Sequence, residues 1–371
     1  MIVNVQTLSL SHSPAKMSSG IIRPRTYFLI IGLWGVLFLT FLFGIGIGPV
    51  AIPVSQTLAV LTDAIGLSWF GDFTAQQSAI LLNIRMPRIL LAMLVGASLG
   101  IGGAVLQGLF RNPLADPGLL GVSSGGALGA VCVIVLGTAW FGSLGAYLHS
   151  FILPLAAFVG ALFAAGIVYA IARRNGRSDK ATMLLAGIAV NAAASSGTGL
   201  LVYISDSEEL KSLTFWIMGS LGGANWHMIA TLGVFILIPV VILPRFARAL
   251  NAMLMGDGVA VHLGFDPVWV NRWAVLLVTA TVGAAVAVSG VIGFVGLIAP
   301  HVVRLIGGAD HRFVLPASAL AGAIILALCD IFARMIVAPA DLPIGVITGS
   351  LGGPFFIWLL MRRAKQGRIA C

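Results

Sequence analysis

The stretch Ile89–Phe110 limits the possible folds more than any other feature of this chain. It holds no charged side chain, and at about 1.5 Å per helical residue it is long enough to cross the roughly 30 Å hydrocarbon layer of a membrane. Gly96, Gly100, Ala104 and Gly108 recur in it at every fourth position. This spacing clears one helix face of bulk and lets a second helix approach closely in lipid. The stretch is predicted to be a transmembrane helix packed inside a bundle.

The composition extends this interpretation to the whole chain. Its 371 residues are 59% hydrophobic and only 9% charged, whereas charged residues make up about a quarter of an ordinary globular domain. The net charge of +9 lies in short segments between apolar runs, which is a pattern that orients helices, so we expect no nucleic-acid partner. Cys132, Cys329 and Cys371 form no C-x-x-C pair, and no metal site or disulfide is predicted.

Ten apolar runs separated by polar or helix-breaking residues predict an all-α integral membrane protein with about ten transmembrane helices. Residues 1–26 are polar and weakly basic, and they are predicted to form a cytoplasmic tail ahead of a transmembrane domain over 27–371. Residues 47–82 are predicted to be an external loop with a short helix, and region 270–306 allows more than one partition. The predicted runs are 27–46, 89–110, 119–137, 150–172, 181–204, 227–244, 270–290, 292–306, 314–333 and 343–361.

Lys and Arg predict the orientation, because they collect in cytoplasmic loops. If the N-terminus is cytoplasmic and the spans alternate, only four of the 21 basic residues face outward: Arg85, Arg88, Lys211 and Arg334. With an odd number of helices, the inner and outer groups of basic residues would be mixed. The unequal distribution of Lys and Arg therefore predicts both termini on the cytoplasmic side. The outward-facing acidic residues would be Asp63, Asp72, Asp206, Glu208, Glu209, Asp330 and Asp341.

Patterns typical of enzymes are weak or missing. Gly-x-Ser-x-Gly occurs around Ser98 and Ser123, but neither has the preceding strand that a nucleophile elbow requires. No lysine follows a glycine, so the chain lacks the G-K of a Walker A loop, and ATP would have to bind a separate polypeptide. We therefore expect a membrane subunit without catalytic residues, without a metal site and without a covalently bound cofactor.

Two charged segments stand out at the ends of the predicted spans. Arg85 and Arg88 flank Met86-Pro87 at a helix mouth, where they would anchor to headgroups or receive acidic groups of an external protein. Asp330 and Arg334 stand one helical turn apart and could pair with each other. No carboxylate lies clearly at mid-membrane, which disfavours an ion-coupled secondary transporter but leaves it as an alternative.

The longest inner segment, residues 245–266, is predicted to form two short helices joined at Gly256-Asp257-Gly258. One interpretation is a linker that lies on the membrane surface. The other is a docking element whose Leu, Met and Val side chains enter a groove on a partner protein.

These features together resemble the FecCD family of permeases from ATP-binding-cassette importers, which take up vitamin B12, ferric siderophores and haem. The resemblance covers nearly the whole chain beyond the N-terminal tail, and its motifs occur in the family's order. They read RMPR, GAVLQGLFRNPLADPGLLGVSSGGALGA, LLAGIAVN, FWIMGSLGGANW, MGDGVAVHLGF, GFVGLIAPHVVRLIGGADHR and DLPIGVITGSLGGPFFIWLL.

The resemblance implies a homodimer of ten-helix permeases in a bacterial inner membrane, with two ATPase subunits and a periplasmic binding protein. It assigns docking of the binding protein to Arg85 and Arg334, and the cytoplasmic gate to Asn112 and Leu114. The turn of a second gate element carries Lys180 where a small polar residue is expected. Coupling to the ATPase falls on segment 250–265, through Met255, Gly256, Asp257, Val259, Val261, Leu263 and Gly264.

The substrate is predicted from one outer segment, ISDSEELKSLTFWIMGSLGG, which is most similar to that of haem permeases. The expected function is therefore import of haem from periplasm to cytoplasm by alternating access, with ATP on the partner subunits. A ferric-siderophore or cobalamin permease of the same family is the alternative.

Overall fold

The computed structural model describes residues 24–365 except 65, 68–70, 142–143, 175–176 and 339. Most of the predicted N-terminal tail and the last six residues lie outside this part of the chain. The elements are α1 (Pro24–Gly46), α2 (Val54–Asp63), α3 (Ala75–Ala79), the π-helix η1 (Ile80–Arg85), α4 (Met86–Phe110), the 3-10 helix η2 (Pro117–Leu120), α5 (Val122–Phe141), α6 (Leu144–Ala172), β1 (Arg173–Arg174), β2 (Arg177–Ser178), α7 (Lys180–Ile204), α8 (Ser207–Ile217), α9 (Trp226–Ile242), the 3-10 helix η3 (Leu243–Phe246), α10 (Ala247–Leu254), α11 (Asp257–His262), α12 (Pro267–Ser289), α13 (Val295–Gly307), α14 (His311–Ile336) and α15 (Ile344–Lys365).

Each predicted apolar run corresponds to one helix of the bundle. Within the described residues, eight helical stretches are long and apolar enough to cross a membrane, and the apolar helices α5 and α13 are shorter. The ten-helix prediction is thus confirmed, and the break between α12 and α13 at residues 290–294 decides the partition of region 270–306. In region 47–82 the structure has two short α-helices, α2 and α3, where one was expected.

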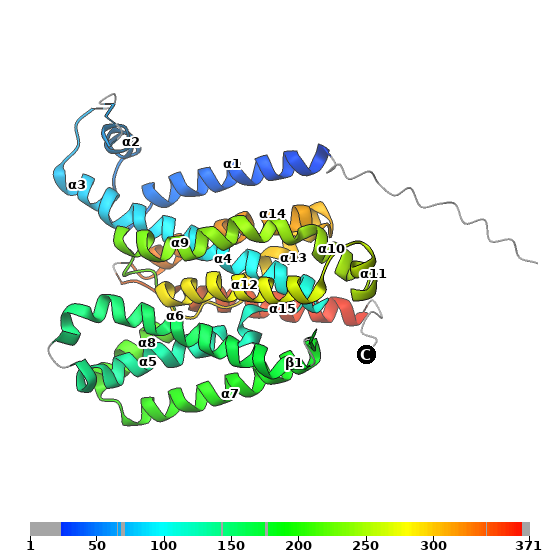
Figure 1. Cartoon of the computed structure of the whole chain (residues 1–371). Helices are drawn as coiled ribbons and strands as arrows, with labels where there is room; N and C mark the ends of the chain where they lie inside the picture. Colours follow the sequence, from blue (N-terminus) through cyan, green and yellow to red (C-terminus); the bar gives the residue numbers. More distant parts are fainter. Residues whose placement is uncertain are drawn as a thin grey trace, which may run out of the picture.

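Helix α4 lies in the middle of the bundle and packs on α12, α13 and α14 (Figure 1). Its glycine face meets α14, where the backbone at Gly96 touches that at Gly322 and the backbone at Gly100 touches that at Ser318. A Cβ at Gly96 or Gly100 would overlap a carbonyl oxygen of α14. This confirms the close helix contact predicted from the four-residue spacing.

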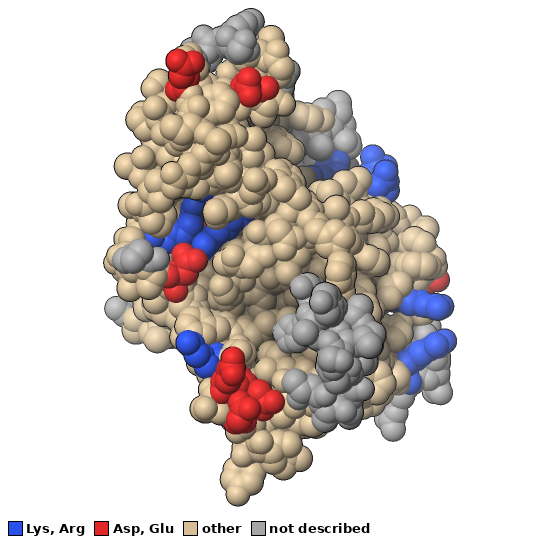
Figure 2. All heavy atoms as spheres, turned by 90° about the vertical axis from the view of Figure 1, so that its left-hand side faces the viewer, with Lys and Arg blue, Asp and Glu red and all other residues tan. Residues whose placement is uncertain are grey.

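The bundle has two chemically different ends. The α2 end carries α2, α3 and residues 337–343, and the α11 end carries α10, α11 and the β1–β2 hairpin (Figure 1). Figure 2 views the molecule toward the α2 end, where acidic side chains form separate groups and basic atoms lie recessed near its centre. The hairpin, which pairs Arg173 with Ser178, is the one departure from an all-α fold among the described residues.

Candidate functional site

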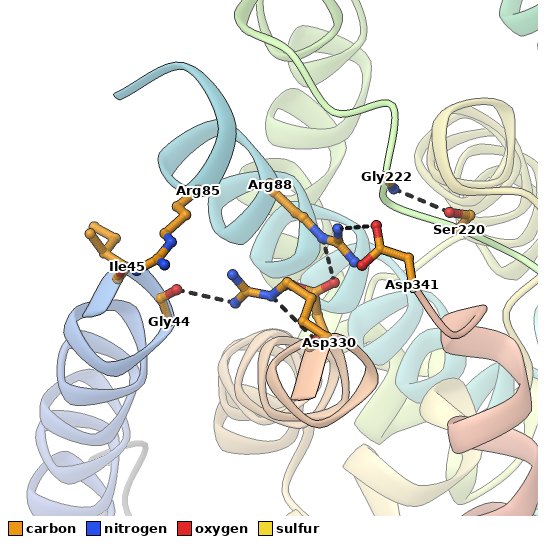
Figure 3. Close-up of polar contacts among 9 residues, drawn as sticks. Gly44, Ile45, Arg85, Arg88, Ser220, Gly222, Asp330 and Asp341 are labelled. Atoms are coloured by element: carbon orange, nitrogen blue, oxygen red, sulfur yellow. Dashed lines mark hydrogen bonds and ion pairs between the residues drawn. The ribbon is translucent and has the colours of Figure 1, made fainter. Parts of the chain in front are cut away.

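A cluster of three arginines and two aspartates lies at the α2 end, and we call it the arginine cluster (Figure 3). Arg85 is the last residue of η1 and Arg88 lies in the first turn of α4. Pro87 stands between them at the junction of η1 and α4, inside the continuous helical stretch of residues 75–110. Asp330 and Arg334 lie one turn apart on α14, and Asp341 follows in the segment before α15.

Ion pairs hold the centre of the cluster together. The Nε of Arg88 lies 2.9 Å from Oδ1 of Asp330, and its Nη1 lies 2.8 Å from Oδ2 of Asp341. The Nε of Arg334 lies 3.1 Å from Oδ2 of Asp330, which confirms the predicted pairing. Arg88 is therefore already paired with two carboxylates of its own chain. Its partner Asp330 is 242 residues away, beyond the reach of any local pattern.

Backbone carbonyls accept further hydrogen bonds from Arg85 and Arg334. Arg85 donates to Ile45 at 3.0 Å, to Gly46 at 2.9 Å and also to Val50. Arg334 donates to the carbonyl of Gly44 at 3.1 Å. Both side chains are only 3% exposed, so in this conformation they bind the end of α1. Their docking role stays a prediction, and it requires these contacts to open.

The arginine cluster is connected through the backbone to a cavity beneath α8. After Asp341 the chain enters α15, where the N–H of Ile344 donates to the carbonyl of Gly219 at 3.0 Å. The next N–H, that of Ser220, donates to the carbonyl of Ser289 at 2.8 Å. Ser220 and Ser289 both line the cavity, which has a volume of about 570 Å³ and also exposes Glu208 and Trp216. Two backbone hydrogen bonds thus join the segment after Asp341 to the wall of this cavity.

At the α11 end, the loop after α4 holds the two predicted gate residues. Arg111 ends α4 in a left-handed conformation with φ 52°, which turns the chain sharply. The side-chain oxygen of Asn112 accepts a hydrogen bond from the N–H of Leu114 at 2.9 Å, and both residues are half-buried. The hydrogen bond gives this turn a defined shape, and the gate role of the two residues stays a prediction.

The predicted coupling segment has the expected two helices, α10 and α11, and its joint lies at Met255-Gly256. Gly256 with φ 128° and Gly264 with φ 84° bound α11 in conformations that favour glycine. Met255 is 73% exposed, and Val261 and Leu263 are 58% exposed. These apolar side chains project from the α11 end, as a docking element would require. Their contact with an ATPase remains a prediction.

Asp257, the first residue of α11, joins the coupling segment to both predicted gate elements. Its carboxylate is paired with Arg111, which adjoins the Asn112 turn. The Nζ of Lys180, the first residue of α7, lies 3.7 Å from the same carboxylate. The unexpected lysine of the second gate element thus has a structural role, because it faces the coupling segment. The sequence predicted only an external partner for Asp257, because Arg111 and Lys180 are distant from it along the chain.

A second tether binds α10 to the start of α14. The amide of Asn251 donates to Asp310 at 2.7 Å and its oxygen accepts from the N–H of His311 at 3.0 Å. Burial opposes ionisation of Asp310, but hydrogen bonds from Arg312 and Asn251 outweigh it and lower the pKa of Asp310 to about 2. The sequence could indicate only the capping role of Asp310, because an Asp before a helical stretch is a common N-cap.

The enzyme-like patterns have no catalytic geometry. Ser98 lies in the middle of α4 and accepts a hydrogen bond from Thr281 at 3.2 Å, while Ser123 lies in the first turn of α5. Neither stands on a strand-to-helix turn. Within the described ranges, no three His, Cys, Asp or Glu side chains come together as a metal site would need.

Comparison with known proteins identifies the family of this fold. The model of the FecCD transport family matches residues 36–362. The hemin transport system permease protein HmuU of Yersinia pestis is 46% identical over 285 residues, which cover 77% of this chain and 84% of the relative. The vitamin B12 import system permease protein BtuC of Salmonella typhi is 42% identical over 317 residues, which cover 82% and 92%. A solved inward-facing structure of a metal-chelate type ABC transporter is 31% identical, with a TM-score of 0.78 over 91% of this chain and 99% of that one.

Proposed function

The chain belongs to the FecCD transport family, and from this membership we propose that it carries haem across a bacterial inner membrane. It is a multi-pass membrane protein whose relatives are transport permeases rather than enzymes. Haem is the proposed cargo and is not a resident cofactor. Both chain termini would be cytoplasmic, although the terminal residues themselves lie outside the described part of the structure.

The observation that carries the choice of haem is the 46% identity to a hemin permease. The outer segment of residues 204–223 supports it, because this segment contains the acidic group and the Thr-Phe-Trp sequence typical of haem permeases. In the structure this segment is α8, which Asp206 and Glu209 start with a reciprocal capping box. The identity of 42% to a vitamin B12 permease supports cobalamin as the second candidate.

The proposed assembly is a homodimer with two ATPase subunits and a periplasmic haem-binding protein. The exposed apolar faces of α7 and α15, which include Leu185, Leu200, Leu351 and Trp358, are available for a second copy. ATP on the separate ATPase subunits would drive the cycle, and the exposed apolar residues of the coupling segment would receive the force. Alternating access follows when that force shifts the equilibrium between inward-open and outward-open states.

Docking of the binding protein would act at the arginine cluster. Three guanidinium groups face two carboxylates there, so one positive charge is in excess and suits an acidic group on the partner. Because Arg85 and Arg334 are buried, the partner must compete with the carbonyls at the end of α1. Binding and an opening of the α2 end would then be the same event.

Uptake by the reconstituted importer tests the cargo. The full chain is placed in liposomes with its ATPase and binding protein, and haem, a ferric siderophore and cobalamin are offered separately. We expect ATP-dependent accumulation of haem alone. Accumulation of cobalamin or of the siderophore instead would identify that compound as the cargo. Uptake by this chain alone, abolished by uncouplers, would contradict an ATP-driven importer.

Stimulation of ATPase activity by the binding protein tests the docking role. We expect Arg85→Glu, alone and with Arg334→Glu, to abolish this stimulation. Arg173→Glu in β1, at the opposite end of the bundle and outside the coupling segment, is the matched control and should leave stimulation unchanged, because its exposed side chain is remote from the arginine cluster. Unchanged stimulation in the Arg85→Glu variant, with normal basal hydrolysis as evidence of folding, would refute docking at Arg85.

A further inference from the structure

An elongated groove lies at the α11 end, between η3 and α10 on one side and the first half of α12 on the other. Its volume is about 660 Å³. We call it the aromatic groove, and its principal lining residues are Arg245, Phe246, Asp266, Trp269, Trp273 and Leu277.

The groove has a polar mouth and an apolar far end. Asp266 begins α12 at the mouth, and Leu277 lies eleven residues further along the helix. At about 1.5 Å per residue the groove follows α12 for about 16 Å. This distance is close to one leaflet, which is half of the roughly 30 Å hydrocarbon layer. The groove therefore has the length and the change in polarity of a lipid molecule.

Aromatic rings form its wall at the level of the membrane surface. Phe246 stacks on Trp269 with centroids 5.7 Å apart and an interplanar angle of 12°, and Trp273 lies 6.2 Å beyond. Trp269 is 54% exposed and Trp273 is 39% exposed, so neither ring is covered by this chain. Tryptophan is enriched where acyl chains meet headgroups, which places the mouth of the groove at that level.

The charge at the mouth favours an anion. The guanidinium of Arg245 donates to the carbonyl of Val241 at 3.1 Å, and within the described part of the chain it has no carboxylate partner. The carboxylate of Asp266 already accepts the N–H of Val268 at 2.9 Å as the cap of α12. Arg248 on α10 and Arg272 on α12 are also exposed on the two helices that border the groove, so the basic side chains of these helices and of η3 outnumber Asp266.

We propose that the aromatic groove binds one phospholipid with an anionic headgroup. Its acyl chain would lie along Trp273 and Leu277, and its phosphate would meet Arg245. Ala249 of α10 and Gly264 after α11 also line the groove, so the lipid would touch the residue before the coupling segment and the end of that segment. Anionic lipid would thereby help to set the position of the segment that receives force from the ATPase.

Tryptophan quenching by brominated lipids tests the proposal on the complete transporter in nanodiscs. Brominated phosphatidylglycerol and brominated phosphatidylcholine are each titrated into a phosphatidylcholine background. The contribution of the groove is the difference between the natural chain and Trp269→Phe with Trp273→Phe. Trp34→Phe gives the matched control, because Trp34 is 59% exposed on α1 and reports bulk lipid.

We expect half-quenching of the groove tryptophans at about fivefold less brominated phosphatidylglycerol than phosphatidylcholine, because a single arginine at the surface supplies about that preference. Trp34 should show no preference between the two lipids, and Arg245→Gln should abolish the preference of the groove tryptophans. Equal quenching by both lipids would mean that the groove has no preference for an anionic headgroup and contacts only bulk lipid. Quenching of Trp34 but not of the groove would mean that a protein subunit covers it, and either result overturns the proposal. The readout depends on neither the cargo nor the docking protein.

Discussion

Asp330 has no exposed surface, yet it faces the guanidinium groups of both Arg88 and Arg334. Removing its charge would leave those two cations buried beside Arg85, with only Asp341 to balance them. Asp341 is different, because its side chain is 47% exposed and water can replace its contact with Arg88. The two carboxylates bind the same arginine but differ in burial, so they form a matched pair for mutation.

We predict that Asp330→Asn destabilises the protein by about 3–5 kcal/mol, which is typical when one partner of a buried ion pair is removed. Asp341→Asn should cost at most about 1 kcal/mol, as for exposed pairs. Thermal unfolding in detergent, followed by circular dichroism, measures both. Similar losses in the two variants would mean that burial does not govern the strength of this cluster.

Asp310 predicts a pH dependence of stability at the other end of the molecule. Its folded-state pKa of about 2 lies below its ordinary value of 3.8, so its contribution is present above pH 3.8 and is lost as pH falls through about 2. Because the side chain is 41% exposed, we expect at most about 1 kcal/mol. Asp310→Asn keeps the helix cap and removes only the charge. Denaturant unfolding of both forms should show a difference that is constant from pH 7 to 4 and shrinks toward pH 2, whereas a difference that grows on acidification would contradict the assignment.

At the scale of elements, the contact between α4 and α14 is the most demanding in the bundle. The two backbones touch at Gly96 and Gly322, where no space exists for a Cβ. We predict that Gly96→Val costs about 3 kcal/mol or more, because overpacking here must separate two helices. Gly32→Val is the control, since a Cβ at Gly32 on α1 meets nothing within 4 Å. Equal yields and melting temperatures of the two variants would rule out this close packing.

Asp257 allows a prediction about coupling, given the proposed function. Its carboxylate is shared by Arg111 and Lys180, which belong to the two predicted gate elements. Asp257→Asn should lower the cargo moved per ATP by about fivefold, because an ion pair of about 1 kcal/mol would no longer transmit movement of α11. Assembly with the ATPase should persist. The double variant Asp257→Arg with Arg111→Asp should recover part of the loss, and a normal transport ratio in Asp257→Asn would show that the contact is passive.

The long helices could be predicted from sequence because span length and small-residue spacing are local properties. All ten apolar runs became helices, and the face at Gly96 and Gly100 packs as expected. The pairing of Arg88 with Asp330 could not be predicted, since it joins residues 242 positions apart. The same holds for Asn251 with Asp310, whose contact depends on how α10 folds back. Local patterns specified which residues carry charge, and only the packing specified their partners.

At the scale of the whole molecule, the two ends differ in charge, and this difference predicts the orientation in which the chain crosses the membrane. The α11 end carries Arg245, Arg248, Arg272 and Arg312, while the α2 end carries the acidic residues of α8. Basic loops remain on the cytoplasmic side during insertion. The α11 end should therefore face the cytoplasm, which is also where an ATPase could reach the coupling segment.

Cysteine labelling measures this orientation directly. Gly258 and Gly223 lie at opposite ends of the bundle, and a side chain added at either meets nothing within 4 Å. In a chain whose Cys132, Cys329 and Cys371 are replaced by alanine, Gly223→Cys should react with an impermeant maleimide in intact cells. Gly258→Cys should react only after permeabilisation, in a chain expressed without its ATPase so that the site is uncovered. The reverse pattern would place the arginine cluster in the cytoplasm, where no periplasmic protein could dock, and the proposed direction of import would fail with it.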